Sequence, residues 1–135
     1  MNGYFAPPGI GGSSFYSVPP CRAYDSRKNN GQPFQGERTL NIVNSQCATR
    51  TMAHAYLFNA TVVPSPTLGY LTLWADGQTM PGVSTLNAYD GFITSNMAIV
   101  PNMNGSIDAY ASGLTQLILD ISGYFARQGE LSHNR

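Results

Sequence analysis

Hydrophobic and polar residues alternate with a period of two along most of this 135-residue chain, which is the spacing of β-strands that bury one face. The longest alternating run covers residues 52–63 and ends at the Pro-Ser-Pro segment 64–66, because proline cannot donate to a β-ladder. Residues 70–74 alternate in the same way, and two short strands flank a break at Ser95-Asn96. No stretch combines the length and the periodicity of a helix. The pattern therefore predicts an all-β protein.

Further strands are predicted at both ends of the chain. Residues 15–18 form a short strand that ends at Pro19-Pro20. Residues 107–111 and 117–121 form the last two strands, separated by a turn that begins at Ser112-Gly113. About seven or eight short strands with Gly, Pro and Asn turns favour an antiparallel β-sandwich, of the jelly-roll or immunoglobulin-like kind. A barrel is the alternative.

A five-residue phrase occurs near both ends of the chain. Residues 2–6 read Asn-Gly-Tyr-Phe-Ala and residues 122–126 read Ser-Gly-Tyr-Phe-Ala, so four of five positions match at a separation of 120 residues. A period of this length is typical of tandem globular modules. We therefore interpret residues 1–14 as a linker with the tail of a preceding repeat, 15–126 as a single β-sandwich module and 127–135 as a C-terminal tail. Coincidence, or a duplicated terminal strand, is the alternative interpretation.

The chain is unusually poor in charge. Charged residues are 10% of the sequence, against roughly 25% in an average globular domain, and seven acidic and seven basic side chains give a net charge of zero. Nucleic acids and anionic membranes are bound through clustered Lys and Arg, and this chain has one lysine, Lys28. No apolar run reaches the roughly eighteen residues of a membrane span. The composition argues against nucleic-acid partners and membrane insertion.

Two cysteines, Cys21 and Cys47, form an even count in a turn-rich chain. As a disulfide they would close a loop of about 27 residues and stabilise the fold by roughly 3 kcal/mol. Two buried free thiols are the alternative. A zinc site has little support, because it needs histidine partners at short spacing and the two histidines, His54 and His133, stand alone. We predict a disulfide, no metal and no cofactor.

Several short motifs occur along the chain in a recognisable order. The pattern is PCR-x-x-DTR, with Ser26 at the Thr position here, followed by N-x-T, GYL-x-x-W, STLN, N-x-A-x-VP and D-x-x-GYF, at residues 20–27, 59–61, 69–74, 84–87, 96–101 and 120–125. It resembles a repeat module of uncharacterised bacterial secreted proteins, found in tandem or beside other extracellular domains. The chain departs from that pattern with Ser26 in place of threonine and Ser122 in place of the frequent asparagine. The resemblance implies a secreted bacterial β module and brings no catalytic residues with it.

The first motif holds two arginines around one aspartate: Arg22, Asp25 and Arg27. A carboxylate can accept two parallel hydrogen bonds from a guanidinium, so these residues could form an anion or ligand pocket. We favour a structural corner, because neighbouring Cys21 marks this turn as part of the scaffold.

Carbohydrate binding is predicted around the single tryptophan. The candidate residues are Tyr70, Trp74, Asp76, Gln78 and Asn87. An aromatic face stacks on a sugar ring, while amide and carboxylate groups bond its hydroxyls. The alternative is that Trp74 is a core residue.

Hydrolysis is the third interpretation. His54 is the histidine that a serine nucleophile would use, but the chain has no Gly-x-Ser-x-Gly elbow. A glycosidase would need two carboxylates, and Asp76 with Asp90 is the least implausible pair.

The sequence thus predicts a non-catalytic extracellular module, structural or adhesive, at the bacterial cell surface. Whether it is an enzyme stays open at this point, with the balance against catalysis. Its expected partners are further copies of itself or neighbouring repeats, with glycans as the second kind of partner. A carbohydrate-binding module is the alternative function, and a small glycosidase or esterase is the third.

Overall fold

A computed structural model describes residues 14–43, 45, 47, 53–65 and 68–126, and within them the chain is all-β. One 3-10 turn, η1 (Lys28–Asn30), interrupts the strands. The strands are β1 (Ser14–Asp25), β2 (Phe34–Asn41), β3 (Ala55–Pro64), β4 (Gly69–Ala75), β5 (Leu86–Ala88), β6 (Thr94–Pro101) and β7 (Ser106–Ala126). The predicted fold class is confirmed. The expectations for residues 1–13 and 127–135 lie outside the described residues.

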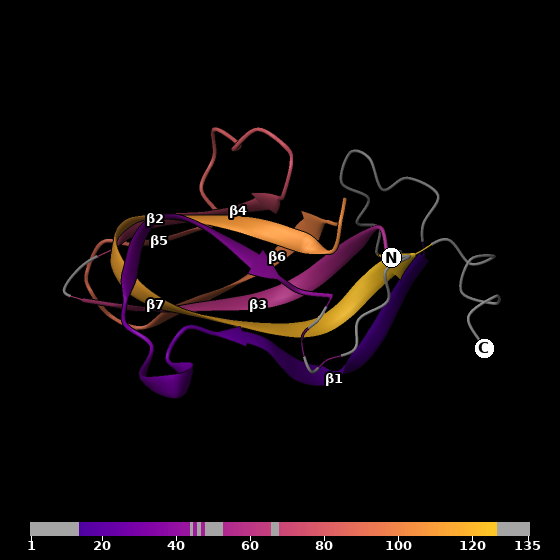
Figure 1. Cartoon of the computed structure of the whole chain (residues 1–135), viewed down its shortest axis with the longest axis horizontal. Coiled ribbons are helices and arrows are strands. Elements are labelled where there is room, and N and C mark those ends of the chain that lie inside the picture. Colours follow the sequence, from indigo (N-terminus) through magenta and orange to yellow (C-terminus); the bar gives the residue numbers. More distant parts are fainter. Residues whose placement is uncertain (1–13, 44, 46, 48–52, 66–67, 127–135) are drawn as a thin grey trace.

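Strand β7 is the centre of the fold. It is 21 residues long and pairs antiparallel with four other strands. Its first half lies between β2 and β4, and its second half lies between β1 and β3 (Figure 1). The hydrogen-bonded order across the sheet is β5-β4-β7-β3-β6. One curved strand therefore carries two sets of partners.

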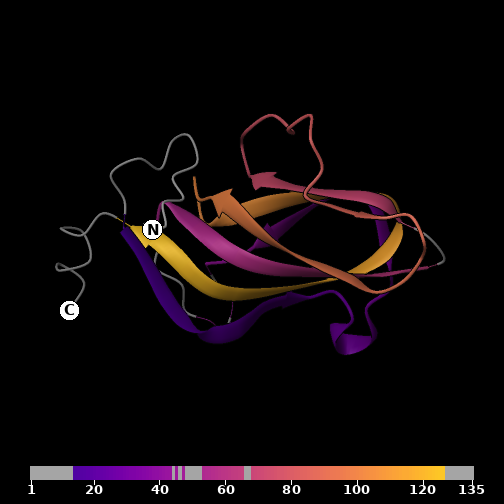
Figure 2. The ribbon, with the colours of Figure 1, turned by 180° about the vertical axis from the view of Figure 1, so that it is seen from behind.

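The curvature of β7 nearly closes the sheet into a barrel, which can be followed from both sides in Figures 1 and 2. β5 and β6, at the two ends of the strand order, approach each other. Asn96 Nδ2 of β6 donates to the carbonyl oxygen of Thr85, just before β5, at 3.0 Å. This arrangement fits both the sandwich and the barrel that the sequence predicts.

The predicted turn at Ser112-Gly113 is wrong, because β7 continues through both residues without a chain reversal. The two residues lie where β7 changes partners: its pairing with β4 ends at Ala111, and its pairing with β3 begins at Thr115. The Ser112 hydroxyl donates to the Leu68 carbonyl oxygen and accepts from the Tyr70 N–H at 2.9 Å. The Ser112 side chain thus takes the place of backbone hydrogen bonds at this point. The residues predicted to form a turn instead mark where β7 stops pairing with β4 and starts pairing with β3.

Two other predicted strand breaks are also wrong. β1 continues through Pro19-Pro20, where its register with β7 shifts between Ser17 and Cys21. The prolines lie in this irregular stretch, where the ladder to β7 is interrupted, so their lack of a backbone N–H costs no hydrogen bond of the ladder. β6 likewise continues through Ser95-Asn96, which pair with β3 across an unbroken ladder.

The hydrophobic core lies inside the curved sheet. It is filled by apolar side chains from alternate positions of the strands, as the period of two requires. The largest fully buried side chains are those of Tyr56, Phe58, Ile42, Leu71, Ile107, Leu117, Leu119, Val62 and Val100. On β4, Leu71 and Leu73 point into this core, so Tyr70, Thr72 and Trp74 lie on the opposite face.

Gly69 should be intolerant of a side chain, because it sits at the point where β7 changes partners. Its φ is +82°, and an added Cβ would lie 2.6 Å from Ser112 Oγ. We expect Gly69→Ala to lower the free energy of unfolding by roughly 1–3 kcal/mol, measured by urea denaturation. Gly82→Ala is the matched control, since nothing lies within 4 Å of its added Cβ. Equal losses in both variants would contradict this account of the partner change.

Candidate functional site

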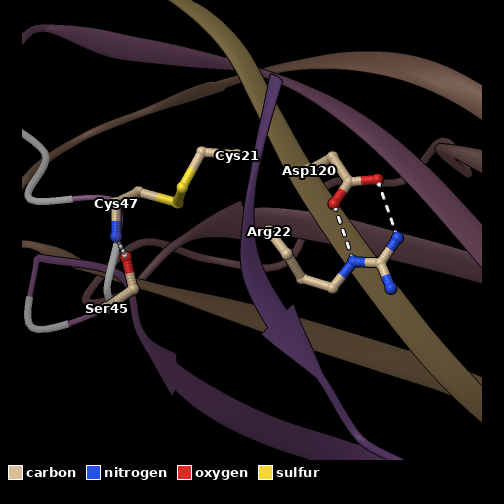
Figure 3. Close-up of a disulfide and its surroundings, with 5 residues drawn as sticks. All are labelled: Cys21, Arg22, Ser45, Cys47 and Asp120. Carbon is tan, nitrogen blue, oxygen red and sulfur yellow. Dashed lines mark hydrogen bonds and ion pairs between the residues drawn. A yellow bond between two sulfur atoms is a disulfide. The ribbon is translucent and has the colours of Figure 1, made fainter. Parts of the chain in front are cut away.

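The predicted disulfide is confirmed: Cys21 is bonded to Cys47, with their Cα atoms 5.7 Å apart (Figure 3). It joins the irregular stretch of β1 to the segment that follows β2. The Cys47 N–H donates to Ser45 Oγ at 3.4 Å. The bond therefore fastens the connection between β2 and β3 to the edge of the sheet.

The charged corner next to the disulfide is a set of ion pairs. Arg27 donates through Nε and through a terminal guanidinium nitrogen to the two carboxylate oxygens of Asp25, each at 2.9 Å. Arg22 Nε donates to Asp120 Oδ1 at 2.9 Å (Figure 3). Arg22 Nη1 also lies 3.6 Å from Asp25 Oδ2. Because both guanidinium groups meet carboxylates of the fold itself, this geometry favours a structural corner over an anion pocket. The sequence did not predict the pairing of Arg22 with Asp120, because the two residues lie 98 positions apart and become neighbours only through the register of β1 and β7.

A pocket lies on the face of β4 opposite the core. The loop between β4 and β5 stands above the sheet (Figures 1 and 2). Together with the two strands it encloses a volume of about 290 Å³. The lining residues are Tyr70, Thr72, Met80, Pro81, Gly82, Val83, Ser84, Asn87 and Tyr89. None of these side chains carries a charge.

The structure brings two of the five candidate glycan-binding residues into this pocket. Tyr70 and Asn87 are register partners on β4 and β5, and both line it. Trp74 is only 5% exposed and does not line the pocket, so its ring cannot present a face to a sugar there. The Asp76 carboxylate accepts from Asn104 Nδ2 at 3.0 Å, and the Gln78 N–H closes a turn onto the Ala75 carbonyl oxygen.

Sequence reasoning missed most of the pocket. Thr72 could have been found, since alternation places it on the same face as Tyr70. Residues 80–84 and Tyr89 lie in turns, where no periodicity indicates which face of the sheet a loop covers. The glycines and proline between Gly77 and Gly82 indicate a loop and nothing more.

The carboxyl groups considered for hydrolysis have separate partners. Asp90 Oδ1 accepts from the Phe92 N–H at 3.1 Å, whereas Asp76 is hydrogen-bonded to Asn104 and Asp108. His54 lies just before β3, where its backbone N–H donates to the Phe125 carbonyl oxygen at 2.6 Å. Asp76 therefore meets Asp108, a residue that the sequence did not single out, and not Asp90.

Asp108 is a carboxyl group on a sheet face that is nevertheless only 5% exposed. It accepts from the Thr39 hydroxyl at 2.8 Å. Burial raises the pKa of Asp108, and the hydrogen bond from Thr39 acts against this shift. The neighbouring Asp76 and Glu37 raise the pKa further. The pKa of Asp76 itself is lowered, mainly by its hydrogen bond from Asn104. The pKa values of these two neighbouring carboxyl groups are thus shifted in opposite directions, and Asp108 is the group that favours the protonated form.

Among the described residues, no group of three or more His, Cys, Asp or Glu side chains is arranged to hold a metal ion. The part of the chain that the structure describes contains no helix long and apolar enough to cross a membrane.

The ion pair of Asp25 should make stability depend on acid pH. The pKa of Asp25 is lowered from 3.8 to about 2, mainly by the side-chain hydrogen bonds from Arg27. The ionised form therefore stabilises the fold above the unfolded pKa, and this contribution is lost as the pH falls towards 2. We expect Asp25→Asn to be less stable at neutral pH by roughly 1 kcal/mol, since half-exposed Arg27 is screened by solvent. Urea denaturation should show the difference shrinking below about pH 4.

Asp90→Asn is the control for this experiment, because Asp90 accepts from a backbone N–H and forms no ion pair within the described residues. If its difference from the wild type shrinks with acid as much as that of Asp25→Asn, the ion pair is not the cause.

Asp108 should give the opposite pH dependence. A raised pKa means that its contribution to stability is present at low pH and is lost as the pH rises through the folded pKa. We expect Asp108→Asn to gain stability relative to the wild type as the pH rises above about 4, the ordinary pKa of an aspartate, measured by urea denaturation at each pH. Glu37→Gln changes an exposed carboxyl nearby and should show a weaker trend. A difference that does not vary with pH for Asp108→Asn would contradict the prediction.

No protein-family model, curated protein or solved structure matches this chain.

Proposed function

We propose that this chain is a non-catalytic, extracellular adhesive module that binds further copies of itself, either as free subunits or as neighbouring repeats. The observation that carries the proposal is a concentration of exposed apolar side chains in one segment. Of the nine large hydrophobic side chains that are exposed in the described part of the chain, six lie between residues 80 and 97. They are Met80, Val83, Tyr89, Phe92, Ile93 and Met97. We call residues 80–97 the apolar segment.

The exposed side chains of the apolar segment are more favourably covered by a protein partner than left in contact with water. Phe92 and Ile93 are adjacent and are 71% and 68% exposed, which costs free energy unless another surface covers them. Isolated exposed hydrophobic residues need no explanation, whereas adjacent, largely exposed residues such as Phe92 and Ile93 are typical of an interaction site.

The charge of the protein supports a second copy as the partner. The net charge is zero, so two copies approach without long-range repulsion. Several of the few charges are also neutralised within the fold, as at Arg22, Arg27, Asp25 and Asp120. With little electrostatic contribution to recognition, contact between apolar surfaces is the main attraction that the exterior offers.

The disulfide supports an extracellular location, because such bonds persist mainly in oxidising compartments. The hydrogen-bonded partners of Asp76 and Asp90 support a non-catalytic role, since each carboxylate is already part of a local structure. Placement in a tandem array rests on the repeated Gly-Tyr-Phe-Ala phrase.

Carbohydrate binding is the second candidate function. The observation that favours it is the uncharged pocket that part of the apolar segment forms with β4, lined by Tyr70, Thr72 and Asn87 among others. Small-molecule sites combine such apolar walls with a few polar groups that fix orientation.

Self-association should depend on the apolar segment. We expect the wild type to form dimers or larger species as its concentration rises in sedimentation-velocity experiments, and Phe92→Ser with Ile93→Ser to shift it towards monomer at least about tenfold in dissociation constant. Met103→Ser is the matched control, since Met103 is similarly exposed and lies outside the segment. A wild type that stays monomeric at high concentration, or an equal effect of the control, would overturn the proposal.

A further inference from the structure

The pocket above β4 is anchored at both ends of its loop. At the start, the Gln78 N–H donates to the Ala75 carbonyl oxygen at 3.1 Å, and Gly77 adopts a φ of +93°. At the end, the Thr85 N–H donates to the Leu71 carbonyl oxygen at 2.8 Å, and Thr85 Oγ1 accepts from the Leu73 N–H at 2.9 Å. The loop therefore leaves β4, arches over it and returns to the same strand. The space beneath the loop is thus bounded by β4 on one side and by the loop on the other.

Thr72 lines this pocket with a hydroxyl that forms no hydrogen bond within the described residues. The residue as a whole is only 2% exposed, so its position is fixed by the surrounding sheet and loop. A polar group that lines a pocket and has no protein partner is suited to a ligand that supplies one.

Further polar and aromatic groups surround Thr72. Asn87 Oδ1 accepts from the Ser84 hydroxyl at 2.9 Å, which fixes the orientation of the amide, while its N–H₂ group has no partner in the described chain. The Tyr70 ring packs against Tyr110, with centroids 5.9 Å apart, and is thereby held in place at the pocket. Tyr89 lines the pocket with an exposed ring. The site thus offers hydrogen-bonding groups beside aromatic faces.

We propose that this pocket binds a neutral sugar residue, with one aromatic ring stacked on the sugar and with Thr72 and Asn87 bonded to its hydroxyls. The inference rests on carbohydrate binding as the second proposed function, and adds the position of the site and the class of sugar. A sugar ring has an apolar C–H face and a hydroxyl edge, which matches this lining. Acidic sugars are disfavoured, since no Arg, Lys or His lines the pocket. Its volume of about 290 Å³ lies at the lower end of small-molecule sites, which suits one sugar residue or a chain end.

The test is an NMR titration of the isotope-labelled protein with neutral methyl glycosides of glucose, galactose, mannose and N-acetylglucosamine, with glucuronate as the charged comparison. We expect at least one neutral glycoside to shift the signals of Tyr70, Thr72 and Asn87 with a dissociation constant of about 10 mM or below. Glucuronate should bind more weakly.

Two variants locate the interaction. Thr72→Val keeps the side-chain shape but removes the hydroxyl, and should weaken binding by about two- to tenfold. Tyr89→Ala removes an exposed ring without threatening the core, and should weaken binding by about threefold or more. Thr61→Val is the matched control, because Thr61 lies on β3 and its hydroxyl is bonded to Ser95 at 2.8 Å. It should bind sugars as the wild type does.

The outcomes separate the inference from the functions on which it builds. Sugar binding that shifts other residues, or equal binding of glucuronate, would overturn the neutral-sugar pocket while leaving carbohydrate binding standing. No binding of any sugar, or binding of a proline-rich peptide in place of sugars, would overturn both. Phe92→Ser with Ile93→Ser should keep the sugar affinity of the wild type, so a failure of self-association is seen independently.

Discussion

The backbone ladder of β7 sets the position of every other strand in the described fold, because four of them bond to it and the other two bond to those four. A single strand can serve four partners only if it is long and bends, and this one exchanges β2 and β4 for β3 and β1 near Ser112. The bend carries the sheet around the core. Near-closure of the barrel is thus a consequence of one strand's length and curvature.

The sequence predicted β3 and β4 within a few residues, because the alternation of hydrophobic and polar residues is a local property of both segments. It failed at Ser112-Gly113 and Pro19-Pro20, where turn-forming residues lie in strands that change partner or register. Nothing local distinguishes a chain that reverses from a chain that continues with new neighbours. β5 was missed because three residues are too few to show a period.

The same limit applies to the candidate site. The disulfide needed only a count of two cysteines, and the Asp25–Arg27 pair needed only proximity in sequence. Thr72 and Trp74 lie on the same face of β4, so alternation alone cannot say which of them lines the pocket beneath the neighbouring loop. The deciding fact is the path of the loop after β4, which depends on Thr85 returning to that strand.

Thr85 lies inside the apolar segment, between the pocket loop and the residues that continue to β6. Its N–H and hydroxyl are bonded to β4, whereas its carbonyl oxygen accepts from Asn96 of β6. In β5, which follows at once, Leu86 and Ala88 are buried in the core while Asn87 between them lines the pocket. β5 and Thr85 therefore attach the middle of the apolar segment to the sheet. Because Leu86 and Ala88 are buried in the core, they fix the point at which the pocket loop returns to β4.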